Sequence, residues 1–218
     1  MDSRLCGNDS LITNKMHFLI TAGGTREYID PVRFLSNASS GKMGYALALA
    51  AIKAGHKVTL ISASDLQPPV GVDFVGVDSA AEMLAAVKKV FAKCDCLIMA
   101  AAVSDYTPIK KSKIKIKKSK RDLVIRLKPT IDILDWAQKH RKKNQIVVGF
   151  ALEDKNLRAS AEKKLKEKKL DMIIANSPTA IGANKSTIQI KRPDREWLKL
   201  PQATKTSMAK KIVDLLAC

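Results

Sequence analysis

The sequence predicts an α/β protein with a doubly wound, Rossmann-like, mostly parallel sheet. From His17 onward, short apolar runs typical of buried strands alternate with helical segments, and this alternation favours parallel strands joined by right-handed crossovers. The 218 residues, 46% hydrophobic and 28% charged, suit one globular domain. We therefore expect residues 16–218 to form a single domain. Residues 1–15 are predicted to be a disordered tail, with Met16 as the expected true start.

The first half of the chain contains four predicted strands and two predicted helices. Glycines close the first strand, HFLITAGG, and a long polar loop, TREYIDPVRFLSNASSG, follows it. The segment KMGYALALAAIKAG is rich in helix formers, and we expect Gly55 to cap its end. Ser79 and Glu82 form a capping-box pattern at the start of the next helix. The remaining predicted elements here are the strands KVTLIS and DFVGVD, the helix SAAEMLAAVKKVFAK, and DCLIMAAAVSDY, a strand that runs into a loop.

The second half continues the alternation and interrupts it once. The interruption, IKKSKIKIKKSKRDLVIRLKPT, alternates Lys or Ser with Ile or Leu, which predicts an extended, lysine-rich β flap. Near the end, STIQIKRPDREWLKL is typical of a β-hairpin across a Pro-Asp turn. The other expected elements are the helix IDILDWAQKHRK, the strand QIVVGFA, the helix NLRASAEKKLKEKK, the strand LDMIIAN and the closing helix KTSMAKKIVDLLA.

Composition excludes several function classes. The formal net charge of +18 indicates an anionic partner, but 5% aromatic residues are too few for single-stranded nucleic-acid binding, and we expect no nucleic acid. No apolar run is long enough to cross a bilayer, so no membrane association is expected. Cysteine usage favours reduced thiols in a cytoplasm, with Cys94 and Cys96 buried on one face of a strand and inert; the other two cysteines are Cys6 and Cys218.

Ligands of doubly wound sheets bind beyond the carboxyl ends of the strands, here the loops 23–44, 100–108 and from 149 onward. Gly23 would let the backbone approach a phosphate, and the amides of Ser39, Ser40 and Gly41 would face it at a helix N-terminus. An NAD(P)-dependent oxidoreductase is the alternative reading. Two features of the sequence count against it. The G-x-G-x-x-G fingerprint is missing, and Ser62 stands where an acidic residue would bind the ribose of NAD. The three histidines, His17, His56 and His140, lie outside these loops, which disfavours a catalytic triad.

Five motifs match a known family in order and approximate spacing: GGTREYIDPVRFLSNASSGKMG, AAVSDY, the KIKK run at 115–118, VGFALE and LDMIIAN. With these motifs the chain resembles the phosphopantothenoylcysteine synthetases of coenzyme A biosynthesis, from about Met16 to its end. No flavin-dependent decarboxylase domain precedes the match, so we expect a stand-alone synthetase without flavin. A separate flavin-dependent decarboxylase is then a candidate partner.

The resemblance implies a two-step ligation. A nucleoside triphosphate, CTP in most bacterial members and ATP as the alternative, activates the carboxylate of 4′-phosphopantothenate and releases pyrophosphate. The amine of L-cysteine then attacks the acyl-nucleotide. Such chemistry relies on Mg²⁺ and fixed cations to neutralise phosphate charge. The resemblance also implies a cytoplasmic homodimer, with the lysine flap as a candidate for crossing toward the partner's active site.

Three polar residues of the strand-end loops are candidates by motif match. Asn37 matches the family asparagine that acts on the acyl-nucleotide, although an Asx turn or helix cap is a common role for a loop Asn. Arg33 matches an arginine suited to a substrate phosphate or carboxylate, with a surface ion pair as its alternative. Asp105 matches a nucleotide-contacting aspartate that could also assist Mg²⁺. Loop solvation is the equally weighted alternative for that metal role.

Further candidates contact the nucleotide in the family. Lys115 matches the triphosphate-binding lysine, but a two-residue slip of the I-K-I-K repeat would put Lys113 there. Lys164 and Lys168 lie four residues apart on a helix and so share a face, with a solvated face as the alternative. Phe150 matches a base-contacting position that core packing would also explain. The segment that would wrap the nucleotide consists of Ile131, Asp132, Ile133 and Leu134, and Thr130 and Ile131 replace the family's usual Asn-Pro there.

Overall fold

The computed structural model describes residues 15–177 and 185–217. Within them, eight strands form one sheet in the order β12-β11-β10-β9-β6-β1-β4-β5. The six strands from β10 to β5 are parallel, whereas β11 and β12 are antiparallel at one edge. Numbered along the chain, the parallel strands follow the order 3-2-1-4-5-6 of dinucleotide-binding sheets. The predicted doubly wound, mostly parallel fold is confirmed.

The strands and helices have the following bounds. The strands of the sheet are β1 (His17–Ala22), β4 (Lys57–Ser62), β5 (Asp73–Gly76), β6 (Cys96–Met99), β9 (Ile146–Leu152), β10 (Met172–Asn176), β11 (Lys185–Lys191) and β12 (Leu198–Thr204). The helices are α1 (Lys42–Lys53), α2 (Ala80–Phe91), α3 (Ile133–His140), α4 (Leu157–Glu167) and α5 (Lys205–Ala217).

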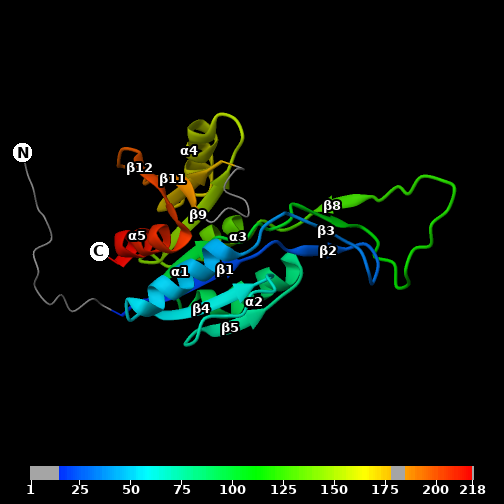
Figure 1. Ribbon diagram of the computed structural model, residues 1–218, viewed down its shortest axis with the longest axis horizontal. Helices are drawn as coiled ribbons and strands as arrows, with labels where there is room; N and C mark the ends of the chain where they lie inside the picture. Colours follow the sequence, from blue (N-terminus) through cyan, green and yellow to red (C-terminus); the bar gives the residue numbers. More distant parts are fainter. Residues whose placement is uncertain (1–14, 178–184, 218) are drawn as a thin grey trace, which may run out of the picture.

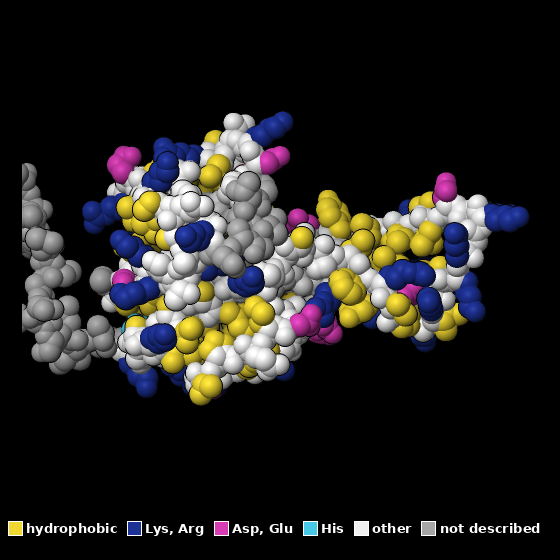
Figure 2. Space-filling view, viewed as in Figure 1, with side chains coloured by type: hydrophobic (Ala, Val, Ile, Leu, Met, Phe, Trp, Pro, Cys, Tyr) yellow, Lys and Arg dark blue, Asp and Glu magenta, His cyan; other side chains and the backbone are white. Residues whose placement is uncertain are grey.

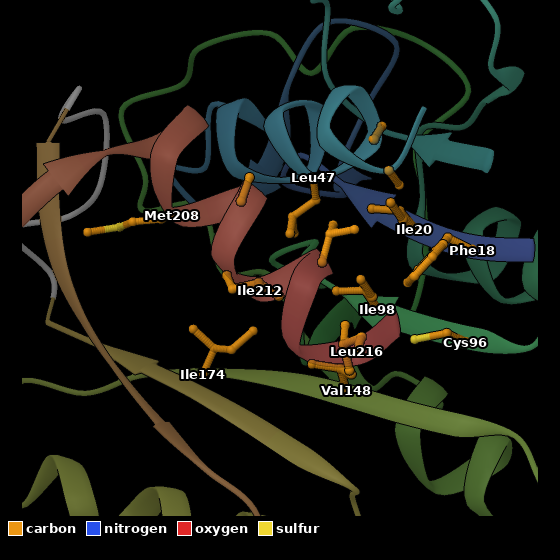
Figure 3. Close-up of a cluster of buried hydrophobic side chains, with 14 of the residues drawn as sticks. Phe18, Ile20, Leu47, Cys96, Ile98, Val148, Ile174, Met208, Ile212 and Leu216 are labelled. Atoms are coloured by element: carbon orange, nitrogen blue, oxygen red, sulfur yellow. The ribbon is translucent and has the colours of Figure 1, made fainter. Parts of the chain in front are cut away.

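Helices cover both faces of the sheet, because its strands are apolar on both sides (Figure 1). On one face, α1 and α5 pack against alternate residues such as Phe18, Ile20 and Ile98 (Figure 3). On the other, α2, α3 and α4 pack against residues of opposite parity such as Leu19 and Leu97. The sheet is therefore the middle of three layers, and only its edges and strand ends reach the surface.

Local signals in the sequence fix two helix ends as predicted. The Ser79 side chain accepts a hydrogen bond from the Glu82 backbone, and the Glu82 carboxylate accepts one from Ser79 N–H, which completes the capping box of α2. After α1, Gly55 has φ +85°, the left-handed conformation that glycine adopts at low cost beyond a helix end. The capping box thus marks where α2 begins, and Gly55 marks where α1 has ended before β4.

Two short ribbons form an arm that projects from the body of the molecule (Figure 1). One is the hairpin of β2 (Arg26–Tyr28) and β3 (Phe34–Ser36), and the other pairs β7 (Tyr106–Pro108) with β8 (Leu127–Pro129). We define the arm as residues 25–36 and 106–129. The polar loop predicted after β1 thus contains a hairpin. The predicted flap exists, but the I-K-I-K run lies in the loop between β7 and β8, outside any strand.

Hydrophobic side chains lie exposed on this arm among lysines and arginines (Figure 2). Of the fifteen exposed large hydrophobic residues among those described, nine belong to the arm: Val32, Phe34, Leu35, Tyr106, Ile109, Ile114, Leu123, Val124 and Leu127. Water-exposed apolar surface of this extent is typical of an interaction site.

The structure also settles expectations about cysteines and histidines. Cys94 and Cys96 are buried free thiols, as expected, and burial raises the pKa of both, that of Cys94 to about 12. The prediction that they share one face of a strand is wrong. Cys94 precedes β6 and packs against the α2 side of the sheet, whereas Cys96 packs on the α1 side. Residues 1–14 of the expected N-terminal tail, which include Cys6, and Cys218 lie outside the described residues. No helix in the described ranges is long and apolar enough to span a membrane.

Candidate active site

A cavity of about 770 Å³ opens at the carboxyl ends of β1, β6 and β9. Neighbouring strands β1 and β6 are where the strand order reverses, the position at which doubly wound sheets bind ligands. Eleven of the predicted site residues line it, drawn from segments more than a hundred residues apart: Asn37, Ser39, Ser40, Gly41, Asp105, Ile131, Asp132, Ile133, Leu134, Phe150 and Lys164.

Asn37 is held against the loop that follows β6. Its Nδ2 donates to the carbonyls of Ala102 (3.3 Å) and Val103 (3.1 Å). Gly24 allows this approach, since a Cβ there would lie 2.4 Å from the Asn37 carbonyl oxygen. The glycines after β1 therefore place the Asn37 loop at the cavity wall. To accept a hydrogen bond from the Asn37 amide, a substrate oxygen would have to displace one of these two backbone carbonyls.

The N-terminus of α1 forms a second wall. Gly41 caps α1 with φ +77°, and neither a side-chain cap nor an acidic residue satisfies the first turn. Ser39, Ser40, Gly41 and Lys42 all line the cavity. A helix start without a side-chain cap or a nearby acidic residue, beside a lysine, is suited to an anion.

Gly23, also a predicted binding residue, lies beneath the cavity and packs against the neighbouring loops. It has φ +83°, and a Cβ there would lie 2.6 Å from Ser64 N. Its carbonyl accepts a hydrogen bond from Ala102 N–H (2.8 Å). Gly23 does not line the cavity; it brings the loops after β1, β4 and β6 together.

Asp105 and the segment 131–134 form the side nearest the arm. Asp105 is exposed at the cavity, and its carbonyl accepts from Thr130 N–H (2.8 Å), which links the loop after β6 to the start of α3. Asp132 caps α3 by accepting from Leu134 N–H and Asp135 N–H. Burial alone would raise the pKa of Asp132, but the hydrogen bond from Lys168 and the capping bonds lower it overall.

The two lysines predicted on one helix face separate in the structure. Lys164 lines the cavity beside Phe150 and donates to the Phe150 carbonyl (2.9 Å). Burial lowers its pKa, with the charges of Asp132 and Asp105 acting in the opposite direction. Lys168 is not among the cavity residues; it forms ion pairs with Asp132 (2.9 Å) and Asp135 (2.8 Å). Its role as a nucleotide ligand therefore stays a prediction.

Arg33 and Lys115, the other predicted catalytic residues, lie on the arm and not at the cavity of their own chain. Arg33 is paired with Asp30 (2.9 Å), and Lys115 is exposed in the loop between β7 and β8, as is its alternative Lys113. The structure does not bring these residues to the other candidates within one chain.

Sequence reasoning missed four polar residues of the cavity. Lys42 directly follows the S-S-G motif, and its position could have revealed it. Asn176 at the end of β10, Ser186 on β11 and Lys205 at the start of α5 carry no local signal. Burial lowers the pKa of Lys205, and the nearby charge of Lys42 lowers it further, so two cations face one end of the cavity.

The fold and cavity define a doubly wound α/β protein with a cavity, lined by lysines and a helix N-terminus, at the switch point of its sheet. Over residues 13–218, the sequence matches the family described as the DNA/pantothenate metabolism flavoprotein C-terminal domain, and the chain belongs to that family.

Its relatives are similar over most of this chain. The coenzyme A biosynthesis bifunctional protein CoaBC of Bacillus subtilis (strain 168) is 43% identical over 207 residues, which cover 92% of this chain and 51% of that protein. A cysteine/cysteine sulfinic acid decarboxylase from an unknown prokaryotic organism is 48% identical over 172 residues, covering 78% and 48% respectively. The chain spans about half the length of these curated relatives.

Solved structures agree with the fold. The crystal structure of the C-terminal domain of CoaBC has a TM-score of 0.81 and 41% identity, covering 93% of this chain and 94% of that one. A Cab2 variant in complex with phosphopantothenate-cysteine has a TM-score of 0.78 at 18% identity, covering 93% and 86%, and shares the fold.

Proposed function

We propose that this chain is a phosphopantothenate–cysteine ligase of coenzyme A biosynthesis. It would join 4′-phosphopantothenate and L-cysteine through an acyl-nucleotide, with CTP as the co-substrate. One observation carries the proposal: family-matched residues from four separate segments, Asn37, Asp105, Asp132 and Lys164, line one cavity beside the start of α1, which has no side-chain cap. The relatives named for coenzyme A biosynthesis support the same reading.

The chemistry needs positioning and charge neutralisation, and no protein nucleophile. A carboxylate oxygen of phosphopantothenate attacks the α-phosphorus of the nucleotide, and the bond to pyrophosphate breaks. The cysteine amine then attacks the acyl carbon, the nucleoside monophosphate leaves and the amine loses a proton. Lys164 and the N–H groups of α1 would offset phosphate charge, and Asn37 would donate to the carbonyl oxygen as negative charge develops on it.

The residues at the cavity fit a magnesium ion held jointly with phosphates. Mg²⁺ binds through one or two carboxylates plus phosphate oxygens, and the exposed Asp105 carboxylate is placed for this. Asp132 is less suited, since both of its oxygens already accept hydrogen bonds or pair with Lys168. When bound, the ion would neutralise charge on the leaving pyrophosphate.

We further propose that two copies associate through their arms, and that each arm brings Arg33 and Lys115 to the partner's cavity. The exposed apolar residues of the arm supply a surface for a second copy. The arm starts at the cavity rim, where Tyr106, Pro129 and Thr130 are cavity residues. The alternative of an NAD(P)-dependent oxidoreductase gains no support, because Ser64 packs on Gly23 and Gly41 at the β4 end, where a ribose would bind.

The ligase proposal is tested by incubating the protein with phosphopantothenate, Mg²⁺ and either CTP or ATP, with and without cysteine. We expect phosphopantothenate-dependent pyrophosphate release without cysteine, amide product only with it, and faster turnover with CTP. Rapid quenching without cysteine should reveal a bound acyl-nucleotide. A cysteine requirement for the first pyrophosphate burst would contradict the two-step scheme.

The homodimer is tested by light scattering. We expect a dimer for the wild type and a shift toward monomer when Leu35, on the arm, is replaced by Asp. Val70, which is 95% exposed on the body, provides the matched control as Val70→Asp. A fully active monomer at all working concentrations would reject the shared site.

A further inference from the structure

Asp30 is a charged side chain buried inside the arm, where no packing need explains it. It lies in the turn between β2 and β3 and has no exposed surface. A buried carboxylate is costly unless hydrogen bonds and opposite charge compensate it. Its partners therefore indicate what it holds in place.

The two oxygens of Asp30 bind two different parts of the chain. Oδ1 accepts from Val32 N–H (2.8 Å) and Arg33 N–H (2.9 Å), which shapes the β2–β3 turn. Oδ2 accepts from the Arg33 guanidinium (2.9 Å) and from the backbone N–H of Ile116 (3.1 Å), 86 residues away. Arg33 Nη2 also donates to the Ile116 carbonyl (3.0 Å), so both backbone groups of Ile116 are bound.

These contacts link the two candidate groups on the arm. Ile116 directly follows Lys115, and its half-buried side chain leaves Lys115 and Lys117 exposed on either side. Burial alone would raise the pKa of Asp30, but the N–H groups of Val32, Ile116 and Arg33, followed by the Arg33 charge, lower it. The carboxylate is thus ionised at neutral pH, which its bond to the guanidinium requires.

We propose that Asp30 is a positioning residue that fixes Arg33 and the Lys115–Lys117 segment as one unit, so that the arm presents both cations together. The kinetic part of this inference rests on the proposed function. The positioning itself does not, because it is a property of the arm alone.

Asp30→Asn is the informative change. Asn offers one oxygen where Asp has two, so either the turn or the Ile116–Arg33 contacts must lose their acceptor. Trypsin cleaves after Lys115 and Lys117, next to the anchored Ile116, and also after Arg121 in the same loop. We expect cleavage after Lys115 and Lys117 to become about tenfold faster, as expected for loss of a charge-assisted hydrogen bond from a local opening equilibrium. Cleavage after Arg121 should not change.

Asp122, exposed on the same loop, provides the matched control as Asp122→Asn, which changes the charge equally and should leave the rates of cleavage after Lys115 and Lys117 unchanged. In the wild type, the Ile116 amide should exchange hydrogen more slowly than the Lys115 amide, which tests the anchor without any variant. Unchanged cleavage in a folded Asp30→Asn protein, or an unprotected Ile116 amide, would overturn the proposal.

Pyrophosphate release then tests the functional consequence. We expect Asp30→Asn to lower the kcat/KM of pyrophosphate release about tenfold. In an Arg33→Gln background the same change should lower kcat/KM less than about twofold, because either substitution already breaks the Asp30–Arg33 contact. Additive losses would show that Asp30 does not act through Arg33. A wild-type protein that releases no pyrophosphate would overturn the proposed function alone, and the proteolysis result would still decide the positioning role.

Discussion

In the body of the molecule, Phe18, Leu19 and Ile20 follow one another along β1 without any exposed surface, whereas Phe34 and Leu35 on the arm are exposed. The body buries apolar residues between helical layers, and its polar residues gather at the strand ends. The arm has two short ribbons, no helix to cover them, and the Asp30 contacts as its internal support. The difference indicates that the body supplies most of the cavity wall, and it supports the proposal that a second copy covers the arm.

The largest expected effect is at the body's side of the site. Asn37→Asp should form the acyl-nucleotide but transfer it to cysteine at least about a hundredfold more slowly, since losing one oxyanion donor costs ~2.7–4 kcal/mol. The intermediate should then accumulate and be seen by mass spectrometry.

The hydrogen bonds of Asn37 call for a second variant. Asp would turn a carboxylate toward the carbonyls of Ala102 and Val103, which could distort the loop, whereas Asn37→Ala removes the donor without adding charge. We expect both variants to slow mainly the second half-reaction. Equal slowing of both half-reactions in both variants would assign Asn37 to loop structure.

The next effect concerns the glycine beneath Asn37. Gly24→Ala would place a Cβ 2.4 Å from the Asn37 carbonyl oxygen, so the loop must shift, and we expect a loss of ~1–3 kcal/mol in the free energy of unfolding together with slower activation. Urea denaturation measures the first and pyrophosphate release the second. Gly76→Ala is the control, because its Cβ would meet only the Phe74 ring at 3.5 Å. Equal behaviour of the two variants would contradict a loop seated by Gly24.

A change on the arm should affect kinetics and leave stability nearly unchanged. Lys115→Ala is expected to raise the nucleotide KM about tenfold and slow activation, while an exposed position shifts the free energy of unfolding by less than ~0.5 kcal/mol. Lys113→Ala is the comparison that decides the register of the I-K-I-K run. Normal nucleotide kinetics in both variants would make the run a solvated surface.

The body was predictable from the sequence because its signals are local. A glycine after a buried strand, the Ser79–Glu82 capping box and the alternation of strands with helices each depend on neighbouring residues. The cavity loops followed from a rule about strand ends, and the family resemblance singled out Asn37 and Asp105 within them; both line the cavity.

The arm and the far end of the cavity were not predictable in the same way. The I-K-I-K alternation favoured a strand, but the loop at Ile116 is held by Asp30, 86 residues away, a contact that no local pattern indicates. Lys205 reaches the cavity because β11 and β12 turn the chain back before α5. Lys164 lies on α4 and Lys168 is its C-cap, yet Asp132 and Asp135 at the start of α3 form ion pairs only with Lys168.

The smallest expected effect concerns Lys168, whose ion pairs with Asp132 and Asp135 connect the end of α4 to the start of α3. Burial alone would lower its pKa, but the hydrogen bonds and charges of Asp135 and Asp132 raise it overall, and the pKa of Asp132 is lowered. The ion pair of Lys168 with Asp132 therefore stabilises the fold fully between pH 3.8 and pH 10.5, the ordinary pKa values of the two groups. Its contribution is lost as pH falls through the lowered pKa of Asp132 or rises through the raised pKa of Lys168.

Lys168→Met should accordingly cost ~0.5–1 kcal/mol of unfolding free energy at pH 7, a modest value because both carboxylates are nearly half exposed to screening water. The cost should shrink as pH falls below 3.8 and vanish once pH is below the lowered pKa of Asp132, as measured by urea denaturation at several pH values. Lys163→Met is the matched control on α4, since Lys163 has only a 3.9 Å, exposed pair with Glu167 and should change stability by ~0.3 kcal/mol or less. If Lys168→Met instead leaves stability at pH 7 unchanged and raises the nucleotide KM, Lys168 is a ligand of the nucleotide, and its ion pairs with Asp132 and Asp135 do not stabilise the fold.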